Sequence, residues 1–135
     1  MTSKKNIQTS GKRKTAVARA VTHPGTGRIT INGLPVEFFP VPLLREKIME
    51  PIVMVGENIN KMDISVDVKG GGVTGQADAA RTAIAKGIVQ FLQDSTIEDS
   101  FKKYDRTILV NDVRRKLPKK PQGSGARAKR QKSYR

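Results

Sequence analysis

The sequence predicts an α+β fold: a two-layer domain with a small, mostly antiparallel sheet, helices on one face, and a long extended basic tail. Residues 62–69 (MDISVDVK) alternate apolar and polar side chains, which is typical of a strand with one buried face. Residues 76–93 place Ala and Ile at helical spacing, which is typical of an amphipathic helix. After residue 112 few side chains are suitable for a core, so we expect a globular domain over 1–112 and a tail over 113–135.

The first third of the chain contains short strands separated by turn residues. We expect one strand to begin over residues 7–10, and two more over 15–21 (TAVARAV) and 28–32 (RITIN), where apolar and other side chains alternate. The turn cluster THPGTG lies between the last two strands, so we expect them to pair as a hairpin with a long loop. Residues 36–39 add a short apolar run.

Two helical segments and a last strand complete the domain. Residues 42–56 have one apolar helical face, and Pro51 inside it predicts a kink or two abutting short helices. The helix over 76–93 is expected to lie close to the sheet because its buried stripe begins with alanines. That stripe consists of Ala77, Ala80, Ile84, Ile88 and Phe91. We further expect a short helix over 96–104 and a final strand over 107–110 (TILV).

The charge of the chain is concentrated in the tail. Residues 1–112 contain 16 basic and 12 acidic side chains, whereas residues 113–135 contain ten basic and no acidic ones. A segment with so little to bury stays open in water, and its cations require a polyanion. A membrane-binding tail would carry bulky apolar anchors, and only Leu117 and Tyr134 qualify here. The tail, which extended would span on the order of 70 Å, is therefore predicted to bind nucleic acid.

The composition disfavours an enzyme. The chain has no Cys, which excludes disulfides, thiolate catalysis and zinc sites with sulfur ligands. Its one histidine, His23, lies in a Pro/Gly turn, and Asp63 and Asp67 are better explained as solvated or paired with cations than as a catalytic pair. We therefore expect no catalytic residues, no metal and no cofactor. No apolar run reaches membrane-spanning length and no signal peptide is evident, so a cytoplasmic protein without a membrane partner is expected.

The glycine-rich segment 70–75 (GGGVTG) has three possible explanations. It matches G-x-G-x-x-G between a strand and a helix, but Asp94 falls at the end of that helix rather than after a second strand, which disfavours dinucleotide binding. The glycines could simply permit a tight turn. They could also bring the backbone and a helix N-terminus close to the phosphates of a polynucleotide. The G-x-x-G within it is similar to the KH clamp, which however lies between two helices.

Three segments in matching order carry a resemblance to a known family. GKRKTAVARA near the start, GGGVTGQADAARTAIAKGI in the middle and GSGARAKRQKSYR at the end resemble the small-subunit ribosomal protein nine family over nearly the whole chain. The QKSYR ending resembles the archaeal and eukaryotic branch, whereas the bacterial form typically ends in Ser-Lys-Arg.

The resemblance implies a fold, a location and partners. The fold would be shared with the second domain of small-subunit protein five and would contain a left-handed β-α-β crossover. The chain would bind ribosomal RNA in the head of the small subunit beside neighbouring ribosomal proteins. Its tail would reach transfer RNA in the peptidyl site during translation, through Ser133, Tyr134 and Arg135.

Basic side chains and the glycine loop are the expected ribosomal RNA contacts, because phosphate contacts position a protein on RNA without reading sequence. They are Lys12, Arg13, Lys14, Gly70, Gly71, Gly72, Arg81, Lys86, Arg114, Arg115, Lys116, Lys119, Lys120, Arg127, Lys129, Arg130 and Lys132. Two other classes remain open: an enzyme, either a nucleotide-binding oxidoreductase or an RNA-processing nuclease, and a free nucleic-acid chaperone or chromatin-like protein. An enzyme predicts a dedicated pocket, and only a ribosomal protein predicts co-sedimentation with small subunits.

Overall fold

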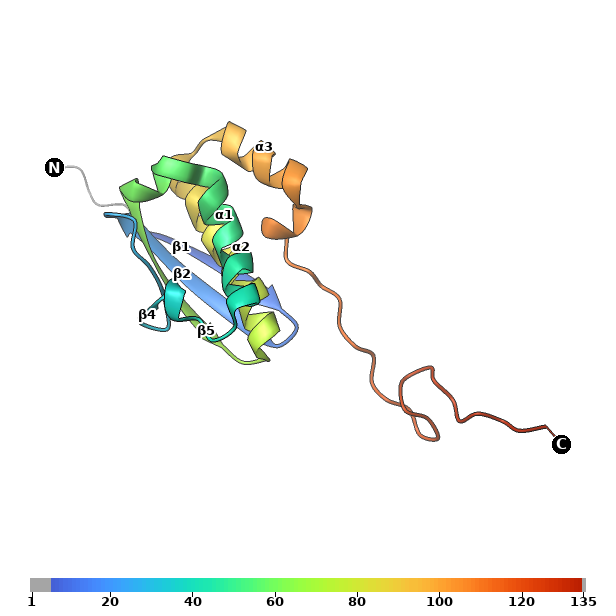
Figure 1. Ribbon diagram of the computed structural model, residues 1–135. Helices are drawn as coiled ribbons and strands as arrows, with labels where there is room; N and C mark the ends of the chain where they lie inside the picture. Colours follow the sequence, from blue (N-terminus) through green and yellow to red (C-terminus); the bar gives the residue numbers. More distant parts are fainter. Residues whose placement is uncertain (1–5, 135) are drawn as a thin grey trace.

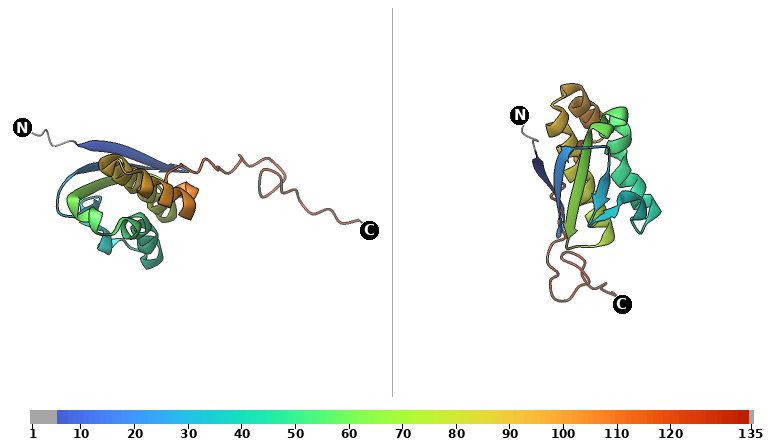
Figure 2. Two further views of the ribbon diagram at one scale, coloured as in Figure 1. Left: turned by 90° about the horizontal axis from the view of Figure 1, so that it is seen from above. Right: turned by 90° about the vertical axis from the view of Figure 1, so that its left-hand side faces the viewer.

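A computed structural model describes residues 6–134 and contains, within them, a five-stranded mixed sheet with three α-helices packed on it (Figure 1). The strands are β1 (Ile7–Arg13), β2 (Ala16–Pro24), β3 (Ile29–Ile31), β4 (Leu34–Pro35) and β5 (Met62–Lys69). The helices are α1 (Pro42–Val55), α2 (Val73–Leu92) and α3 (Ser95–Tyr104), with short 3-10 turns η1 (Val36–Phe38), η2 (Gly56–Lys61) and η3 (Arg106–Ile108). The predicted α+β class is confirmed. The helices cover one face of the sheet (Figure 2).

The strand order, β1-β2-β5-β3-β4, differs from the predicted one. The expected hairpin between 15–21 and 28–32 is wrong, because β5 lies between β2 and β3. β5 is antiparallel to β2 over eight residue pairs and parallel to the three-residue β3. It buries Met62, Ile64, Val66 and Val68, and a strand that long and regular takes the central position. Instead, β2 forms a hairpin with β1, and these two strands pair antiparallel.

β3 and β5 are parallel neighbours joined through α1. The expected left-handed β-α-β crossover corresponds to this β3-α1-β5 connection. Its left-handedness stays a prediction. The other adjacent strand pairs are antiparallel, in agreement with the sequence-based expectation.

α2 lies against β1 and β2 because the residues between them are small. Ala16, Ala18 and Ala20 of β2 are buried toward it. A Cβ atom on Gly11 would lie 2.1 Å from the carbonyl oxygen of Ala79, so β1 has a glycine where the helix crosses it. β1 therefore extends beyond the predicted 7–10 and includes Gly11. Such close approach of backbones is typical of tight helix–sheet packing.

The predicted stripe of α2 is largely confirmed: Ala77, Ala80, Ile84 and Ile88 are buried and Phe91 is partly buried. α2 also buries Ala79 and Ala83, because the sheet lies on one side of it and α1 on the other. α1 runs through Pro51 as one helix, so the alternative of two separate short helices is wrong. Burial of Ile48 and Ile52 on either side of Pro51 offsets the backbone hydrogen bond that proline lacks.

The strand expected over 107–110 is also wrong. Asp105 caps the 3-10 turn η3 instead, and its carboxylate accepts a 2.8 Å hydrogen bond from the Thr107 backbone N–H. This turn carries Ile108 into the core, where it is fully buried. Capping chemistry and burial here outweigh the β propensity of the TILV segment.

Residues 113–134 contain no helix or strand, and nearly all of their side chains are exposed. They leave the domain after η3 (Figure 1). Within the described chain, no helix has the length and apolar character needed to cross a membrane.

Candidate nucleic-acid interface

One corner of the domain joins the β1–β2 turn to the glycine loop that precedes α2. Gly70 and Gly71 adopt positive φ angles of 77° and 67°. Cβ atoms there would lie 2.7 Å from the carbonyl oxygen of Thr15 and 2.9 Å from the backbone nitrogen of Ala16. Both glycines are thus required by a turn that lies directly on the hairpin. The need for a tight turn is therefore enough to explain Gly70 and Gly71.

Gly72 has a different environment. It precedes α2 with φ −97° and ψ 172°, it makes no side-chain capping hydrogen bond, and no atom lies within 4 Å of the position of a Cβ. The backbone N–H groups in the first turn of the 20-residue α2 therefore have no side-chain cap. Helix N-termini of this kind attract anions. The segment differs from the KH clamp as expected, because it follows a strand, β5, and α2 begins at Val73.

Dinucleotide binding requires a parallel strand after the helix, which would complete the crevice. Within residues 6–134, α2 leads instead into α3, and no sheet strand follows it. The geometry therefore gives no support to a nucleotide-binding oxidoreductase.

Exposed cations surround this corner. Lys12 is exposed on β1 and Lys14 in the following turn. Strand register places Lys12 opposite Val17 and Val17 opposite Lys69, so the two lysines lie two strands apart on the sheet face that the helices leave open. The sequence analysis did not include Lys69, although its outward position at the end of an alternating strand could have indicated it. Together with the first two arginines of the tail, we call this group the basic corner: Lys12, Lys14, Lys69, Arg114 and Arg115.

The root of the tail is attached to the same corner. Asp112 pairs with Arg13 in a parallel β-bridge, and the Lys12 backbone N–H donates a 3.2 Å hydrogen bond to Oδ1 of Asn111. The Arg13 guanidinium donates to the Arg114 carbonyl (3.0 Å), and that of Arg115 donates to the Lys14 carbonyl (2.9 Å). Together these interactions fix the point where the basic chain leaves the domain.

Asp112 is central to this attachment. Its carboxylate accepts hydrogen bonds from the backbone and the guanidinium of Arg114, at 2.7–3.0 Å, and lies 3.6 Å from a guanidinium nitrogen of Arg13. These hydrogen bonds, together with the charges of the two arginines, hold the pKa of Asp112 well below its usual range. The sequence analysis missed this residue. The available signal was its position, since Asp112 is the last acidic residue before the ten cations of the tail.

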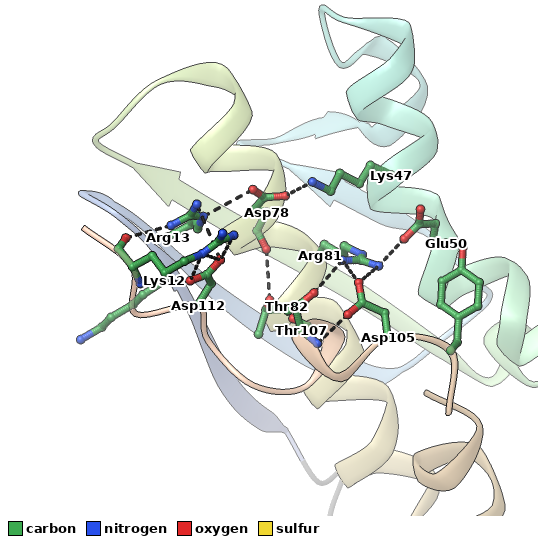
Figure 3. A pocket seen from close by; sticks show the side chains of 12 residues that line it. Lys12, Arg13, Lys47, Glu50, Asp78, Arg81, Thr82, Asp105, Thr107 and Asp112 are labelled. Carbon is green, nitrogen blue, oxygen red and sulfur yellow. Dashed lines mark hydrogen bonds and ion pairs between the residues drawn. The ribbon is translucent and has the colours of Figure 1, made fainter. Parts of the chain in front are cut away.

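A charged cavity of about 530 Å³ lies behind the basic corner, between β1, α1, α2 and η3 (Figure 3). Most of the charged side chains that line it are paired with one another. Asp78 lies 2.5 Å from Nζ of Lys47 and 3.8 Å from Nε of Arg13. Arg81 is buried and forms ion pairs with Glu50 and, at 3.2 Å, with Asp105. Although burial opposes it, hydrogen bonds from Thr107 and Arg81 lower the pKa of Asp105.

This network explains the positions of two predicted phosphate ligands. Arg81 points into the fold, and Arg13 is shared between two carboxylates and the tail backbone. A phosphate contact by either residue stays a prediction. What the geometry gives both of them is a role in joining α2, α1 and the tail root.

The other predicted residues lie apart from the corner. Lys86 lies on α2 about 20 Å along the helix from Val73, where its ammonium donates a 3.0 Å hydrogen bond to the Ser10 carbonyl, and burial lowers its pKa. Lys116, Lys119, Lys120, Arg127, Lys129, Arg130, Lys132, Ser133 and Tyr134 are exposed in the tail. Arg135 lies outside the described residues.

Asp63 has a structural function. One oxygen of its carboxylate accepts backbone hydrogen bonds from Thr26, Gly27 and Arg28 at 2.7–2.9 Å. These bonds, that from Arg28 first, lower its pKa. His23 lies 3.9 Å away with a partly exposed side chain. Asp63 therefore organises the loop between β2 and β3, which agrees with its predicted lack of a catalytic role.

Comparison with known proteins gives a consistent result. A family model described as ribosomal protein S9/S16 matches residues 11–135. A protein of Thermoplasma volcanium named "Small ribosomal subunit protein uS9" is 65% identical over 96% of this chain and 98% of its own length. Proteins with the same name from Thermoplasma acidophilum and Methanothrix thermoacetophila are 63% and 50% identical, over 94% and 97% of this chain and 98% and 99% of their own lengths. These relatives are archaeal, in agreement with the QKSYR ending, which resembles the archaeal and eukaryotic branch. The chain belongs to the ribosomal protein S9/S16 family.

Proposed function

We propose that this chain is a structural constituent of the small ribosomal subunit that anchors on ribosomal RNA through its basic corner and extends its tail along RNA. Membership of a ribosomal protein family makes it a component of the translation machinery and not an enzyme. The relatives are named as small-subunit proteins, which supports the choice of subunit. Ribosomal RNA and neighbouring ribosomal proteins are its expected partners.

The single observation that carries the RNA contact is the coincidence of three features at one corner. Exposed lysines, the N-terminus of α2 without a side-chain cap and the root of a segment with ten cations lie together there. Positive side chains and free backbone N–H groups are the two donor types that phosphates accept from proteins. Recognition of this kind depends on the shape of folded RNA rather than on its sequence.

The attachment of the tail root defines where the tail starts on the domain. Asp112 holds Arg114 and Arg13, so the chain starts from a fixed point beside the lysines of the basic corner. The cations from Arg115 to Lys132 would then follow the grooves between RNA helices in the head of the subunit. In this proposal Ser133, Tyr134 and Arg135 reach the anticodon stem-loop of transfer RNA in the peptidyl site. The left-handed β3-α1-β5 crossover belongs to the same proposal.

The test uses the full chain in small subunits. Removal of residues 133–135 is expected to leave sedimentation with small subunits intact and to weaken transfer RNA binding in the peptidyl site by several-fold. A matched control removes three residues in the middle of the tail, 127–129, which shortens it without changing its end. Unchanged transfer RNA affinity after removal of the end would contradict the contact, and failure of the intact chain to sediment with small subunits would contradict the proposed function.

A further inference from the structure

The surface formed by β4, η1 and α1, which meets the first turn of α2, exposes large apolar side chains. Leu34 and Phe38 are 61% and 71% exposed, and Leu43 and Val53 of α1 are 74% and 72% exposed. We call these four residues the apolar patch. Isolated apolar side chains are normal on a protein surface, but four of this size on β4, η1 and α1 are more than an RNA backbone contact requires.

A small hollow in this surface has a size suited to one side chain. It measures about 230 Å³ and is lined by Ile31, Asn32, Leu34, Pro35, Phe38, Phe39, Pro40, Val73 and Gln76. None of these residues is charged, in contrast to the cavity behind the basic corner. A hollow with apolar walls and two amides accepts an apolar or aromatic side chain better than a phosphate.

The charges around the apolar patch have the opposite sign to those of the rest of the chain. Residues 33–57 contain four acidic and two basic side chains in a chain with a formal charge of +14. Glu37, Glu46 and Glu57 are exposed, and none of them has an ion-pair partner within residues 6–134. Of the two cations, Lys47 pairs with Asp78, whereas Arg45 has no carboxylate partner in the described chain and donates a 2.6 Å hydrogen bond to the Glu37 carbonyl.

We infer that the apolar patch is the docking site for a basic protein segment that inserts one large apolar side chain into the hollow and places Lys or Arg beside Glu37 and Glu46. This inference rests on the proposed function, because neighbouring ribosomal proteins would supply such a segment. The Arg45–Glu37 hydrogen bond ties η1 to the start of α1 and so holds Phe38 and Leu43 on one rigid surface. Interfaces of this type combine a buried apolar anchor with a charged rim, which fixes the choice of partner.

Other occupants fit less well. RNA would meet three carboxylates that have no cation partner in the described chain and, at the hollow, no cation to hold its phosphates. A second copy related by twofold symmetry would bring the same glutamates face to face, and two chains of +14 repel each other. The tail of the same chain starts from the corner formed by β1 and η3, and its only large apolar or aromatic side chains are Val113, Leu117 and Tyr134.

The test places a photoreactive p-benzoylphenylalanine at Phe38 in the full chain and irradiates isolated small subunits. The expected adduct is sensitive to protease and resistant to ribonuclease, and mass spectrometry is expected to identify a segment of another protein with an apolar residue flanked by Lys or Arg. The same group at Lys12 is the matched control and is expected to give a ribonuclease-sensitive adduct. In subunits carrying the photoreactive group at Leu43, Glu37→Lys is expected to reduce the protein adduct about tenfold, as when one important interface residue is removed.

Four outcomes would overturn the inference: a Phe38 adduct to RNA, to a second copy, to the tail of the same chain, or no adduct in subunits that contain the chain. These outcomes leave the proposed function unaffected when the chain sediments normally with small subunits. Absence of the chain from small subunits would overturn the proposed function and the inference together.

Discussion

The basic corner and the apolar patch are built from different elements and also differ in how their charges are satisfied. At the basic corner the carboxylates of Asp78 and Asp112 are paired, and the exposed lysines have no carboxylate partner within the described residues. Beside the apolar patch Lys47 is paired with Asp78 and Arg45 is bonded to the Glu37 carbonyl, while the exposed glutamates have no ion-pair partner in that same part of the chain. In our two proposals these surfaces select different partners, phosphates at the basic corner and a basic protein segment at the apolar patch. The difference teaches that a net charge of +14 describes the chain but not each of its surfaces.

The largest effect is expected from removing the ion pairs that Arg81 forms between the two surfaces. Arg81→Ala leaves Glu50 and Asp105 without their shared cation. Because Arg81 is buried but its partners are partly exposed, we expect a loss of about 2 kcal/mol in the free energy of unfolding. Urea denaturation measures this loss. Arg19→Ala on the open sheet face is the matched control, and an equal effect of both substitutions would contradict the role of the network.

The comparison is sharpened by removing the cations of the basic corner alone. The triple variant Lys12→Ala, Lys14→Ala and Lys69→Ala is expected to weaken ribosomal RNA binding by about tenfold at moderate salt. The log–log salt slope is expected to fall by roughly 0.7–0.9 for each phosphate that is no longer neutralised. The control variant removes Lys61, Lys102 and Lys103, which carry the same charge outside the corner. Equal slopes for the two triple variants would mean that total charge, and not the corner, determines binding.

The local elements of the fold could be predicted from the sequence, whereas their pairing could not. The alternation of β5 and the helical stripe of α2 were predicted correctly, because each pattern reports burial along one element. The strand order was not, because the position of β5 between β2 and β3 depends on pairing across the chain, and no local pattern reports that. The residues of the basic corner show the same difference between local pattern and strand pairing. The lysines of the β1–β2 turn and the glycine loop were predicted from composition, whereas Lys69 depends on strand register, and Asp112 on a bridge to β1.

Asp112→Asn tests whether the tail root directs the basic chain. The substitution removes the carboxylate that binds Arg13 and Arg114, so we expect two changes: a few-fold gain in non-specific RNA affinity and greater protease sensitivity near residue 114. Filter binding and limited proteolysis measure them. Asp99→Asn, at an exposed position on α3, is the control. If both variants are cleaved at the same rate, the attachment at Asp112 does not order the tail root.

The same residue predicts a dependence on pH. The pKa of Asp112 is lower in the folded protein than its ordinary value of 3.8. A carboxylate with a lowered pKa contributes stability that is fully present above that ordinary value and is lost as the pH falls through the folded-state pKa. The stability difference between the wild-type chain and Asp112→Asn should therefore be constant from neutral pH to about pH 4 and shrink below it. A difference that instead grows on acidification would contradict the assigned sign.

The smallest expected effect belongs to the apolar patch. Val53→Ser changes an exposed side chain that does not contribute to the core, so we expect a change in unfolding free energy within about 0.5 kcal/mol and no change in RNA affinity. Thermal denaturation and filter binding measure both. Val66→Ser on the buried face of β5 is the contrasting control and is expected to be strongly destabilising. A loss of RNA affinity in Val53→Ser would erase the distinction between the two surfaces.

Gly87, on the face of α2 that packs against the sheet, affects the position of the whole helix. A Cβ on Gly87 would lie 2.5 Å from the hydroxyl of Thr22, so any larger residue there lifts the C-terminal half of the helix from β2. Because α2 is one continuous rod of 20 residues, lifting one end tilts the other, and the amides beside Gly72 then point in a new direction. A genetic screen for defective subunit assembly should therefore recover substitutions at Gly87, which is buried against Thr22 in the interior of the domain.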